Sequence, residues 1–237
     1  MNETAAKSGP RERPVIAIDG PAGAGKSTLA AHLARKFGFL NLETGAMYRA
    51  LALKAIENDL AFEDEAALMD LAEYTRLALE PQAEGNRVFL DGVDVSRRVR
   101  DVDVTEAASK VSVHPALRAW MVTQQRKLGE RGGVVMEGRD IGSVVFPDAD
   151  LKIFLTASPE VRADRRYHEH RQKGDSIDRA RTLEEIHDRD QRDRERSTSP
   201  LVRAPDAVVV DSTAMEAEEV ARLVVMLAKG KAAGVTT

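Results

Sequence analysis

Eight residues near the beginning of the chain carry the clearest chemical pattern in this sequence. They fit the spacing GxxxxGK[ST], whose backbone N–H groups surround phosphate oxygens, and they read Gly20, Pro21, Ala22, Gly23, Ala24, Gly25, Lys26 and Ser27. An apolar run at 15–18 precedes them and a helical stretch from Thr28 to residue 37 follows, so the N–H groups and the helix dipole point at one spot. Lys26 would reach the β- and γ-phosphates, and the Ser27 hydroxyl would complete a Mg²⁺ site. We interpret the pattern as a nucleoside triphosphate site rather than an ordinary glycine turn.

Two clusters of polar residues follow later apolar runs, where open α/β sheets place their ligands. The first cluster contains Thr44, Tyr48 and Arg49. These three could instead be a helix cap, a core residue and a surface cation. The second cluster places Arg139 beside Asp140 between two glycines. Its location after a predicted strand favours ligand binding, although a surface ion pair is the alternative.

A third cluster lies in a strongly charged stretch near residue 190. Arg189, Asp193 and Arg196 are spaced i, i+4 and i+7, so they share one helix face. The alternative is a solvated helix with i,i+4 ion pairs. Phosphoryl transfer spreads negative charge over three oxygens and requires cations on several sides, and the planar fork of arginine holds two such oxygens at once. A triphosphate site combined with a hinged, arginine-rich segment predicts a kinase that closes over a small acceptor and excludes water.

The elements that must position these residues are those of a doubly wound α/β protein. Helical stretches separate most of the apolar runs that read as buried parallel strands, at 15–18, 39–42, 134–136, 151–155 and 207–210. The long gap after the second strand predicts an insertion with helices at 45–58, 63–73, 104–113 and 115–128, and a small β region with a turn at 84–86. We therefore expect a five-stranded parallel sheet flanked by helices.

Capping signals define further helices in the second half of the chain. Ser158 is a plausible N-cap with Pro159 at the first helical position. Capping-box spacing predicts one helix that opens at Thr182 and another that opens at Thr213. Gly230 is expected to end the last helix.

Composition limits the class of protein. Hydrophobic residues make up 43% of the 237 residues and charged residues 31%, which is typical of a soluble globular protein. The net charge of −4 provides no basic field for nucleic acid, and no apolar run is long enough to span a membrane. Cysteine is absent, which excludes disulfides and thiolate zinc sites and fits a reducing compartment. We expect a cytoplasmic monomer.

Three motifs together resemble the bacterial cytidylate kinase family. They are IDGPAGAGK at 18–26, ETGAMYR at 43–49 and EGRDIGSVVFPD at 137–148. The resemblance continues through LKIFL at 151–155 and the charged helix at 189–196, and it covers almost everything from residue 13 to about residue 228. The phosphate loop is shared by very many proteins, whereas the second and third motifs are specific to this family.

The resemblance implies an activity and a domain organisation. The activity is transfer of the γ-phosphoryl group of MgATP to CMP or dCMP. The implied fold is that of a P-loop NTPase with a nucleoside-monophosphate-binding (NMP-binding) insertion and a short helical lid. The expected boundaries are a core at 14–44, 129–157 and 197–230, the insertion at 45–128, the lid at 158–196, and tails at 1–13 and 231–237.

The resemblance also implies roles for individual residues. Arg49, Arg139 and Arg196 would hold the acceptor phosphate, and Arg139, Arg196 and Lys26 would act in catalysis with Arg165. The residues implied for the rest of the acceptor are Thr44 and Tyr48 lining its pocket, Ser109, Arg118 and Asp140 at the cytosine edge, and Arg189 and Asp193 at the ribose. The lid arginines implied for ATP, besides the phosphate loop and Thr28, are Arg162, Arg165 and Arg166.

The sequence departs from the family pattern at three positions. Glu43 and Glu137 stand where the family usually has aspartate, and Ala22 stands where it often has serine. Neither carboxylate swap removes a charge, so we expect altered rates rather than lost activity. The alternatives are a small P-loop kinase for AMP, UMP or a non-nucleotide acceptor, and a nucleotide-dependent switch. The switch is disfavoured because no Asn-Lys-x-Asp guanine-reading element occurs in the sequence.

Overall fold

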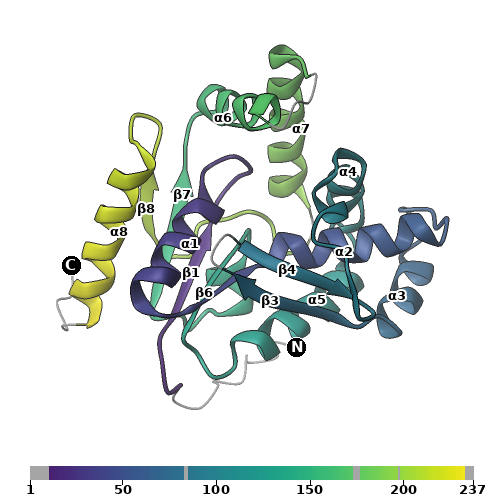
Figure 1. Cartoon of the computed structure of the whole chain (residues 1–237), viewed down its shortest axis with the longest axis horizontal. Coiled ribbons are helices and arrows are strands. Elements are labelled where there is room, and N and C mark those ends of the chain that lie inside the picture. The colour runs from purple at the N-terminus through teal and green to yellow at the C-terminus, as the bar shows by residue number, and fades with distance from the viewer. Residues whose placement is uncertain (1–10, 83–84, 173–176, 197, 233–237) are drawn as a thin grey trace.

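The centre of the molecule is a five-stranded parallel sheet (Figure 1). The computed structural model describes residues 11–82, 85–172, 177–196 and 198–232. In the order in which they pair, the strands are β2 (Leu40–Glu43), β6 (Val134–Gly138), β1 (Val15–Asp19), β7 (Leu151–Thr156) and β8 (Val208–Asp211). Each lies within one or two residues of a strand predicted from the sequence, so the predicted sheet and α/β class are confirmed.

The two faces of the sheet are covered by different helices. Ile16 and Ile18 of β1 pack in the cluster that contains α1 (Lys26–Phe37) and α8 (Ala217–Ala232). Val15 and Ala17 face the other way, toward α5 (Pro115–Gly129) and the turn η2 (Ile141–Val145). Because successive side chains of a strand point to opposite faces, a strand covered on both sides reads as an unbroken apolar run. Burial of all five β1 residues is the structural reason for the run at 15–18.

A tight turn joins β1 to α1 and forms the phosphate loop. Gly20 has φ of +146°, and a Cβ at this position would lie 1.9 Å from the carbonyl oxygen of Leu155 in β7. Gly25 has φ of +92° directly before the helix begins. Glycine is required at both positions because L side chains rarely adopt such angles, and at Gly20 the neighbouring strand leaves no room.

The segment between β2 and β6 forms a layer of its own beside the sheet. Besides α5, its helices are α2 (Thr44–Glu57), α3 (Glu65–Glu73) and α4 (Val102–Val111), with a short 3₁₀ turn η1 (Arg98–Arg100). Its strands form an antiparallel sheet of β3 (Leu77–Gln82), β4 (Gly85–Leu90) and β5 (Val93–Asp94). The predicted turn at 84–86 was wrong for Gly85 and Asn86, which pair with Gln82 and Pro81 inside the ladder, while Glu84 lies outside the described residues.

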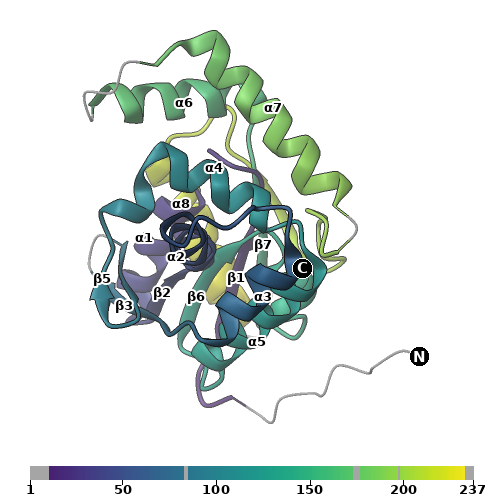
Figure 2. The same cartoon turned by 90° about the vertical axis from the view of Figure 1, so that its right-hand side faces the viewer.

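The segment between β7 and β8 contains the helices α6 (Pro159–Gln172) and α7 (Arg179–Glu195), which lie over one end of the sheet (Figures 1 and 2). Ser158 caps α6 as predicted, since its hydroxyl accepts a hydrogen bond from the N–H of Val161. The predicted start of α7 was wrong by three residues. Asp178 is the N-cap and accepts from the N–H of Arg181, whereas the Thr182 hydroxyl donates back to the carbonyl of Asp178.

Two predictions about the last helix were also wrong. Thr213 does not cap it, because α8 begins at Ala217 and the Thr213 hydroxyl instead accepts from the N–H of Ser158. Gly230 lies inside α8, which continues to Ala232. The expected tails fall mostly outside the described residues. No helix of the described part is both long and apolar enough to cross a membrane.

Candidate active site

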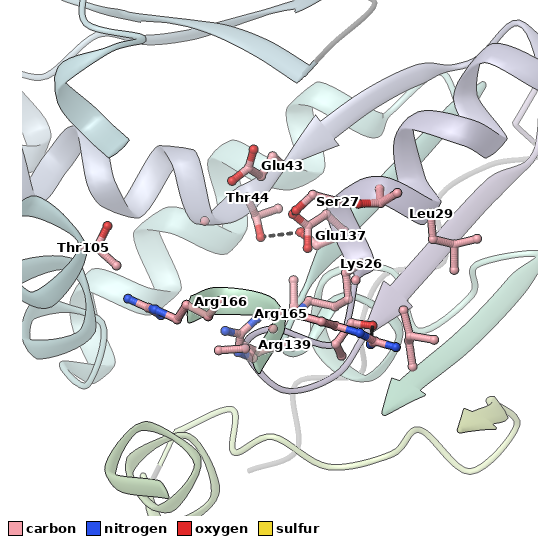
Figure 3. Close-up of a pocket in the computed structure, with 18 of the residues that line it drawn as sticks. Lys26, Ser27, Leu29, Glu43, Thr44, Thr105, Glu137, Arg139, Arg165 and Arg166 are labelled. Atoms are coloured by element: carbon pink, nitrogen blue, oxygen red, sulfur yellow. Dashed lines mark hydrogen bonds between the residues drawn. The ribbon is translucent and has the colours of Figure 1, made fainter. Parts of the chain in front are cut away.

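A single cavity of about 900 Å³ lies at the carboxyl ends of the parallel strands. The phosphate loop, the beginning of α2, the turn after β6, and the helices α4, α6 and α7 all contribute to its wall. Figure 3 shows Arg139, Arg165 and Arg166 along one side of this cavity and Glu43, Thr44 and Glu137 along the other. Ligands of open α/β sheets bind at this edge, so topology and cavity agree.

The phosphate loop forms one end of the cavity. Lys26 is buried, and its Nζ donates to the carbonyl oxygen of Pro21 at 2.8 Å. The Ser27 hydroxyl donates to Oε1 of Glu137 at 2.8 Å, which joins the loop to the end of β6. Arg165 of α6 donates to the carbonyl oxygen of Ser212 at 2.8 Å and also lines the cavity.

The other end of the cavity contains a buried ion pair between α5 and the turn after β6. Arg118 of α5 pairs with Asp140, and both side chains are less than one tenth exposed. A second guanidinium nitrogen of Arg118 donates to the carbonyl oxygen of Ser112. The Cζ atom of Arg118 lies 5.6 Å from the ring centroid of Tyr48. These contacts make a rigid, hydrogen-bonding wall opposite the phosphate loop. Ser109 of α4 lines the same end.

A second arginine cluster lies between these two ends. Arg139 donates through Nε to Oδ2 of Asp193 at 2.7 Å, and Arg196 lies 3.6 Å from Oδ1 of the same carboxylate. Arg189 lies one turn before Asp193 on α7 and also lines the cavity. Arg189, Asp193 and Arg196, which the sequence spacing places on one helix face, therefore all line the cavity.

Buried polar atoms without a hydrogen-bond partner gather at this cavity. Among the described residues they include Oη of Tyr48, Nε of Arg49, Nε of Arg118, Nε of Arg189 and Nη2 of Arg196. A buried donor left unpaired is costly, and native proteins contain few of them. Four of these five are guanidinium donors, so the missing partner has the chemistry of an anion with several acceptor oxygens.

The electrostatics of the site also indicate a missing anion. Burial, together with the nearby charge of Arg139, lowers the pKa of Lys26 to about 7. Burial and Arg139 likewise lower the pKa of Arg189 to about 9. Burial alone would raise the pKa of Asp193, but Arg139 and Arg189 outweigh it and hold that pKa at about 2. These cations destabilise one another, and a bound phosphate group would stabilise them.

The structure brings together most of the residues predicted for the site. All ten residues predicted for the acceptor line the cavity, as do Arg165, Arg166 and the phosphate-loop residues from Ala22 onward. Arg162 does not line it. Its side chain is 2% exposed and its guanidinium is bound to both oxygens of Asp190 and to the carbonyl oxygens of Ala22 and Ala157. The expectation that Arg162 approaches ATP is therefore corrected to a structural contact beneath the phosphate loop.

Several residues that line the cavity were not predicted from the sequence, among them Arg100, Thr105 and Ser112. Arg100 is the last residue of η1, Thr105 belongs to α4, and Ser112 follows the end of α4. Thr105 faces the cavity in Figure 3. Arg100 is one of three arginines at 97, 98 and 100 that resemble an ordinary charged surface, so only the three-dimensional placement distinguishes it. Among the described residues no group of three or more His, Cys, Asp or Glu could hold a metal ion by itself.

Comparison with known proteins now adds to this geometry. The sequence model of the family described as cytidylate kinase matches residues 16–230. The chain is 51% identical over 213 residues to a cytidylate kinase of Pelotomaculum thermopropionicum, covering 90% of this chain and 94% of that protein. It is 46% identical over 228 residues to a cytidylate kinase of Aeromonas hydrophila, covering 96% of this chain and 99% of that protein.

The chain belongs to the cytidylate kinase family. The resemblance seen in the sequence is thereby confirmed. Among solved structures, an uncharacterized protein of Eubacterium ventriosum is 12% identical with a TM-score of 0.50, covering 91% of this chain and 98% of that chain. That likeness concerns the fold alone.

The three departures from the usual cytidylate kinase pattern have visible neighbours. Glu137 accepts from Ser27 Oγ, and Glu43 forms an ion pair with Arg49. Burial would raise the pKa of Glu43, but Arg49 outweighs it and lowers that pKa. Ala22 packs against Ala163 and Ile186 at the base of α6 and α7. Each of the longer carboxylates thus has a partner among the residues of the site.

Proposed function

We propose that this protein transfers the γ-phosphoryl group of MgATP to CMP or dCMP, giving ADP and CDP or dCDP. The observation that carries the proposal is the set of buried, unpaired polar atoms on residues that line one cavity at the end of the sheet. Four of them are guanidinium donors opposite a phosphate loop. A second phosphate-bearing ligand beside the triphosphate supplies the acceptor oxygens that these donors lack.

In this proposal the acceptor nucleotide lies between α2, α5 and α7. Arg49, Arg139 and Arg196 hold its phosphate, since all three line the cavity and two have buried donors free for it. Arg189 and Asp193 contact the ribose from one face of α7. The pocket for the base is lined by Thr44, Tyr48, Ser109, Arg118 and Asp140.

The buried pair of Arg118 and Asp140 suits cytosine. The Asp140 carboxylate accepts a hydrogen bond from the exocyclic amine, and Arg118 donates to acceptor atoms of the ring edge. Uracil presents a carbonyl where cytosine has the amine, so a carboxylate there would face an acceptor without a proton between them. Discrimination against uracil then follows from an unmatched buried group rather than from shape.

The donor nucleotide occupies the phosphate loop. Backbone N–H groups from Ala22 to Ser27 and the ammonium group of Lys26 hold the β- and γ-phosphates. Arg165 and Arg166 of α6 add charge beside the transferred group. These cations stabilise the charge that develops on the transferred phosphoryl oxygens, and they cost no reorganisation when they are already in place.

The oxygen donors at the loop fit Mg²⁺ carried by ATP. The Ser27 hydroxyl and the Glu137 carboxylate are hydrogen-bonded to each other at the loop's end, and hydroxyl and carboxylate oxygens are the ligands that Mg²⁺ prefers. Ser27 would bind the ion directly and Glu137 would hold a water of its shell. When bound, the ion neutralises charge on the β- and γ-phosphate oxygens.

We also propose a division of labour along the chain. The core at 14–44, 129–157 and 197–230 binds ATP, the insertion at 45–128 binds the acceptor, and the lid at 158–196 brings α6 and α7 over both. Closure excludes water, which would otherwise accept the phosphoryl group. That the protein is cytoplasmic, is a monomer and binds neither nucleic acid nor membrane stay predictions. Sedimentation velocity with and without ATP tests whether it is a monomer.

A coupled assay of ADP release tests the proposed activity. MgATP is supplied with CMP, dCMP, UMP or AMP in turn, and ATP without an acceptor is the control. We expect CMP and dCMP to give the highest kcat/KM and ATP alone to give little ADP. Equal or greater turnover with AMP or UMP, or ADP release independent of any acceptor, would refute the assignment.

A further inference from the structure

One buried carboxylate at the end of the central strand lies outside the set of predicted site residues. Asp19 is the last residue of β1, is 4% exposed, and does not line the cavity. Its Oδ1 accepts from the N–H of Ile141 and its Oδ2 accepts from the N–H of Gly142, both at 2.7 Å. Both carboxylate oxygens are therefore committed to the backbone of a turn more than 120 residues away in the sequence.

The turn that Asp19 holds is the one that presents Asp140. The π-helical turn η2 begins at Ile141, and Asp140 occupies its N-cap position. The first N–H groups of any helical turn have no partner inside the turn. An aspartate at the N-cap usually supplies that partner with its own carboxylate. Here the Asp140 side chain makes no capping hydrogen bond.

Asp19 takes over the capping that Asp140 would otherwise provide. With the N–H groups of Ile141 and Gly142 already bound, the Asp140 carboxylate is released from its own turn and pairs with Arg118 in the base pocket. We propose that Asp19 is a positioning residue for nucleobase specificity, which acts by keeping the Asp140 carboxylate in the base pocket. This inference rests on the proposed role of Asp140 in reading cytosine.

The packing around the turn explains why this arrangement is rigid. A Cβ on Gly142 would lie 3.1 Å from Cδ of Lys152 and 3.3 Å from Oδ2 of Asp19. A Cβ on Gly138 would lie 2.7 Å from both Cδ1 of Ile141 and Oγ1 of Thr44. The turn is thus confined from both sides.

Asp19 also connects the two substrate sites. Gly20, the first residue of the phosphate loop, follows it directly, and Asp19 is in register with Gly138 at the end of β6. The same residue therefore ends the strand that carries the donor loop and holds the turn that carries the acceptor residues.

The test compares specificity in four enzymes: wild type, Asp19→Asn, Asp140→Ala and the double variant. Asparagine keeps the size of the side chain but offers one acceptor oxygen, and its amide N–H group opposes a backbone N–H group. Asp150→Asn is the matched control, because Oδ2 of Asp150 accepts from the N–H of Val15 at the opposite end of the same strand. The readout is the ratio of kcat/KM for CMP to kcat/KM for UMP.

We expect Asp19→Asn to lower that ratio by about tenfold or more, because the Asp140 carboxylate turns back to cap its own helix. Asp150→Asn should leave the ratio unchanged. In the Asp140→Ala background the Asp19 substitution should change the ratio no further, since the group it acts through is gone. The ratio does not depend on the folded fraction, because unfolded enzyme converts neither substrate.

Each contrary outcome has a distinct meaning. If Asp140→Ala keeps the wild-type ratio, the base-reading role is wrong and the positioning role is wrong with it. If Asp140→Ala loses specificity while Asp19→Asn lowers turnover of CMP and UMP equally, Asp19 is structural and only the positioning proposal is overturned. Should the asparagine variant be too unstable to assay at 25 °C, Asp19→Ser measured at 10 °C gives the same comparison.

Discussion

Replacing Arg162 by methionine should destabilise the protein without removing an ATP ligand. The Arg162 guanidinium donates to both carboxylate oxygens of Asp190, at 3.0 and 2.6 Å, and to the carbonyl oxygens of Ala22 and Ala157. Both side chains of the pair are less than one tenth exposed. Removing one partner of such a pair leaves a buried charge uncompensated and costs about 3–5 kcal/mol.

A second substitution separates the charge from the packing. An apolar cluster of Ala22, Ala163 and Ile186, with Leu183 packed against it, lies beside the pair: Ala163 follows Arg162 in α6, and the carbonyl oxygen of Ala22 accepts a hydrogen bond from Arg162. Arg162→Met combined with Asp190→Leu removes both charges and keeps similar volumes. Apolar replacement of a whole buried pair is often neutral or stabilising. We therefore expect the double variant to recover most of the lost stability, to within about 1 kcal/mol of wild type.

Urea unfolding and steady-state kinetics together decide the role of Arg162. The unfolding free energy should fall in the single variant and recover in the double variant, and the KM for ATP in the double variant should stay within about threefold of wild type. A double variant of restored stability whose KM for ATP is still raised tenfold or more would refute this reasoning. Arg162 would then contact ATP, as the sequence first suggested.

Three further predictions concern the phosphate loop and the strand before it. Lys26→Met should lower kcat by about 10²-fold or more in the coupled assay, because a cation is lost where charge develops; near-normal turnover would place the phosphates elsewhere. Gly20→Ala should weaken ATP binding at least about tenfold in calorimetry, since its Cβ meets the carbonyl oxygen of Leu155, whereas Gly38→Ala, with nothing within 4 Å, should bind ATP normally. Burial raises the pKa of Asp19 from 3.8 to about 6 in the folded protein, so its stabilising contribution is complete below about pH 4 and is lost as the pH rises through 6. The unfolding free energy of wild type relative to Asp19→Asn should therefore fall by about 1 kcal/mol between pH 5 and pH 7 in urea titrations, and a constant difference would contradict it.

The parts of the fold that could be predicted are those with a local physical cause. The run at 15–18 is apolar because both faces of β1 are covered, so every consecutive side chain of the strand is buried. The phosphate loop is recognisable because Gly20 and Gly25 need conformations that only glycine adopts readily. Signals of this kind lie within a few residues of the structure that they specify.

Capping signals were less decisive because more than one residue could provide the cap. Asp178 and Thr182 are both good N-caps, and only the structure shows that α7 begins after Asp178. Gly230 resembles a helix end, but α8 continues past it because the helix packs against α1 over several turns. Tertiary packing overrides a single unfavourable residue in such places.

Some contacts between distant segments could not be predicted from the sequence. The bonds from Asp19 to the turn at 141–142, and the burial of Arg162 against Asp190, depend on which strands become neighbours. Nothing in the spacing of the sequence distinguishes a lid arginine that reaches the cavity, such as Arg165, from one that is bound beneath the loop, such as Arg162. That distinction required the arrangement of α6 and α7 over the sheet.

Transfer of labelled phosphate from [γ-³²P]ATP is the most direct test of the central claim, which is that the unpaired donors of the cavity bind a cytidine monophosphate opposite the ATP. The protein is mixed with Mg²⁺, labelled ATP and CMP, and the products are separated by thin-layer chromatography. The account predicts that the label appears in CDP and that little inorganic phosphate forms. Label found mainly in inorganic phosphate, or in UDP or ADP in preference to CDP when the acceptors compete at equal concentration, would contradict it.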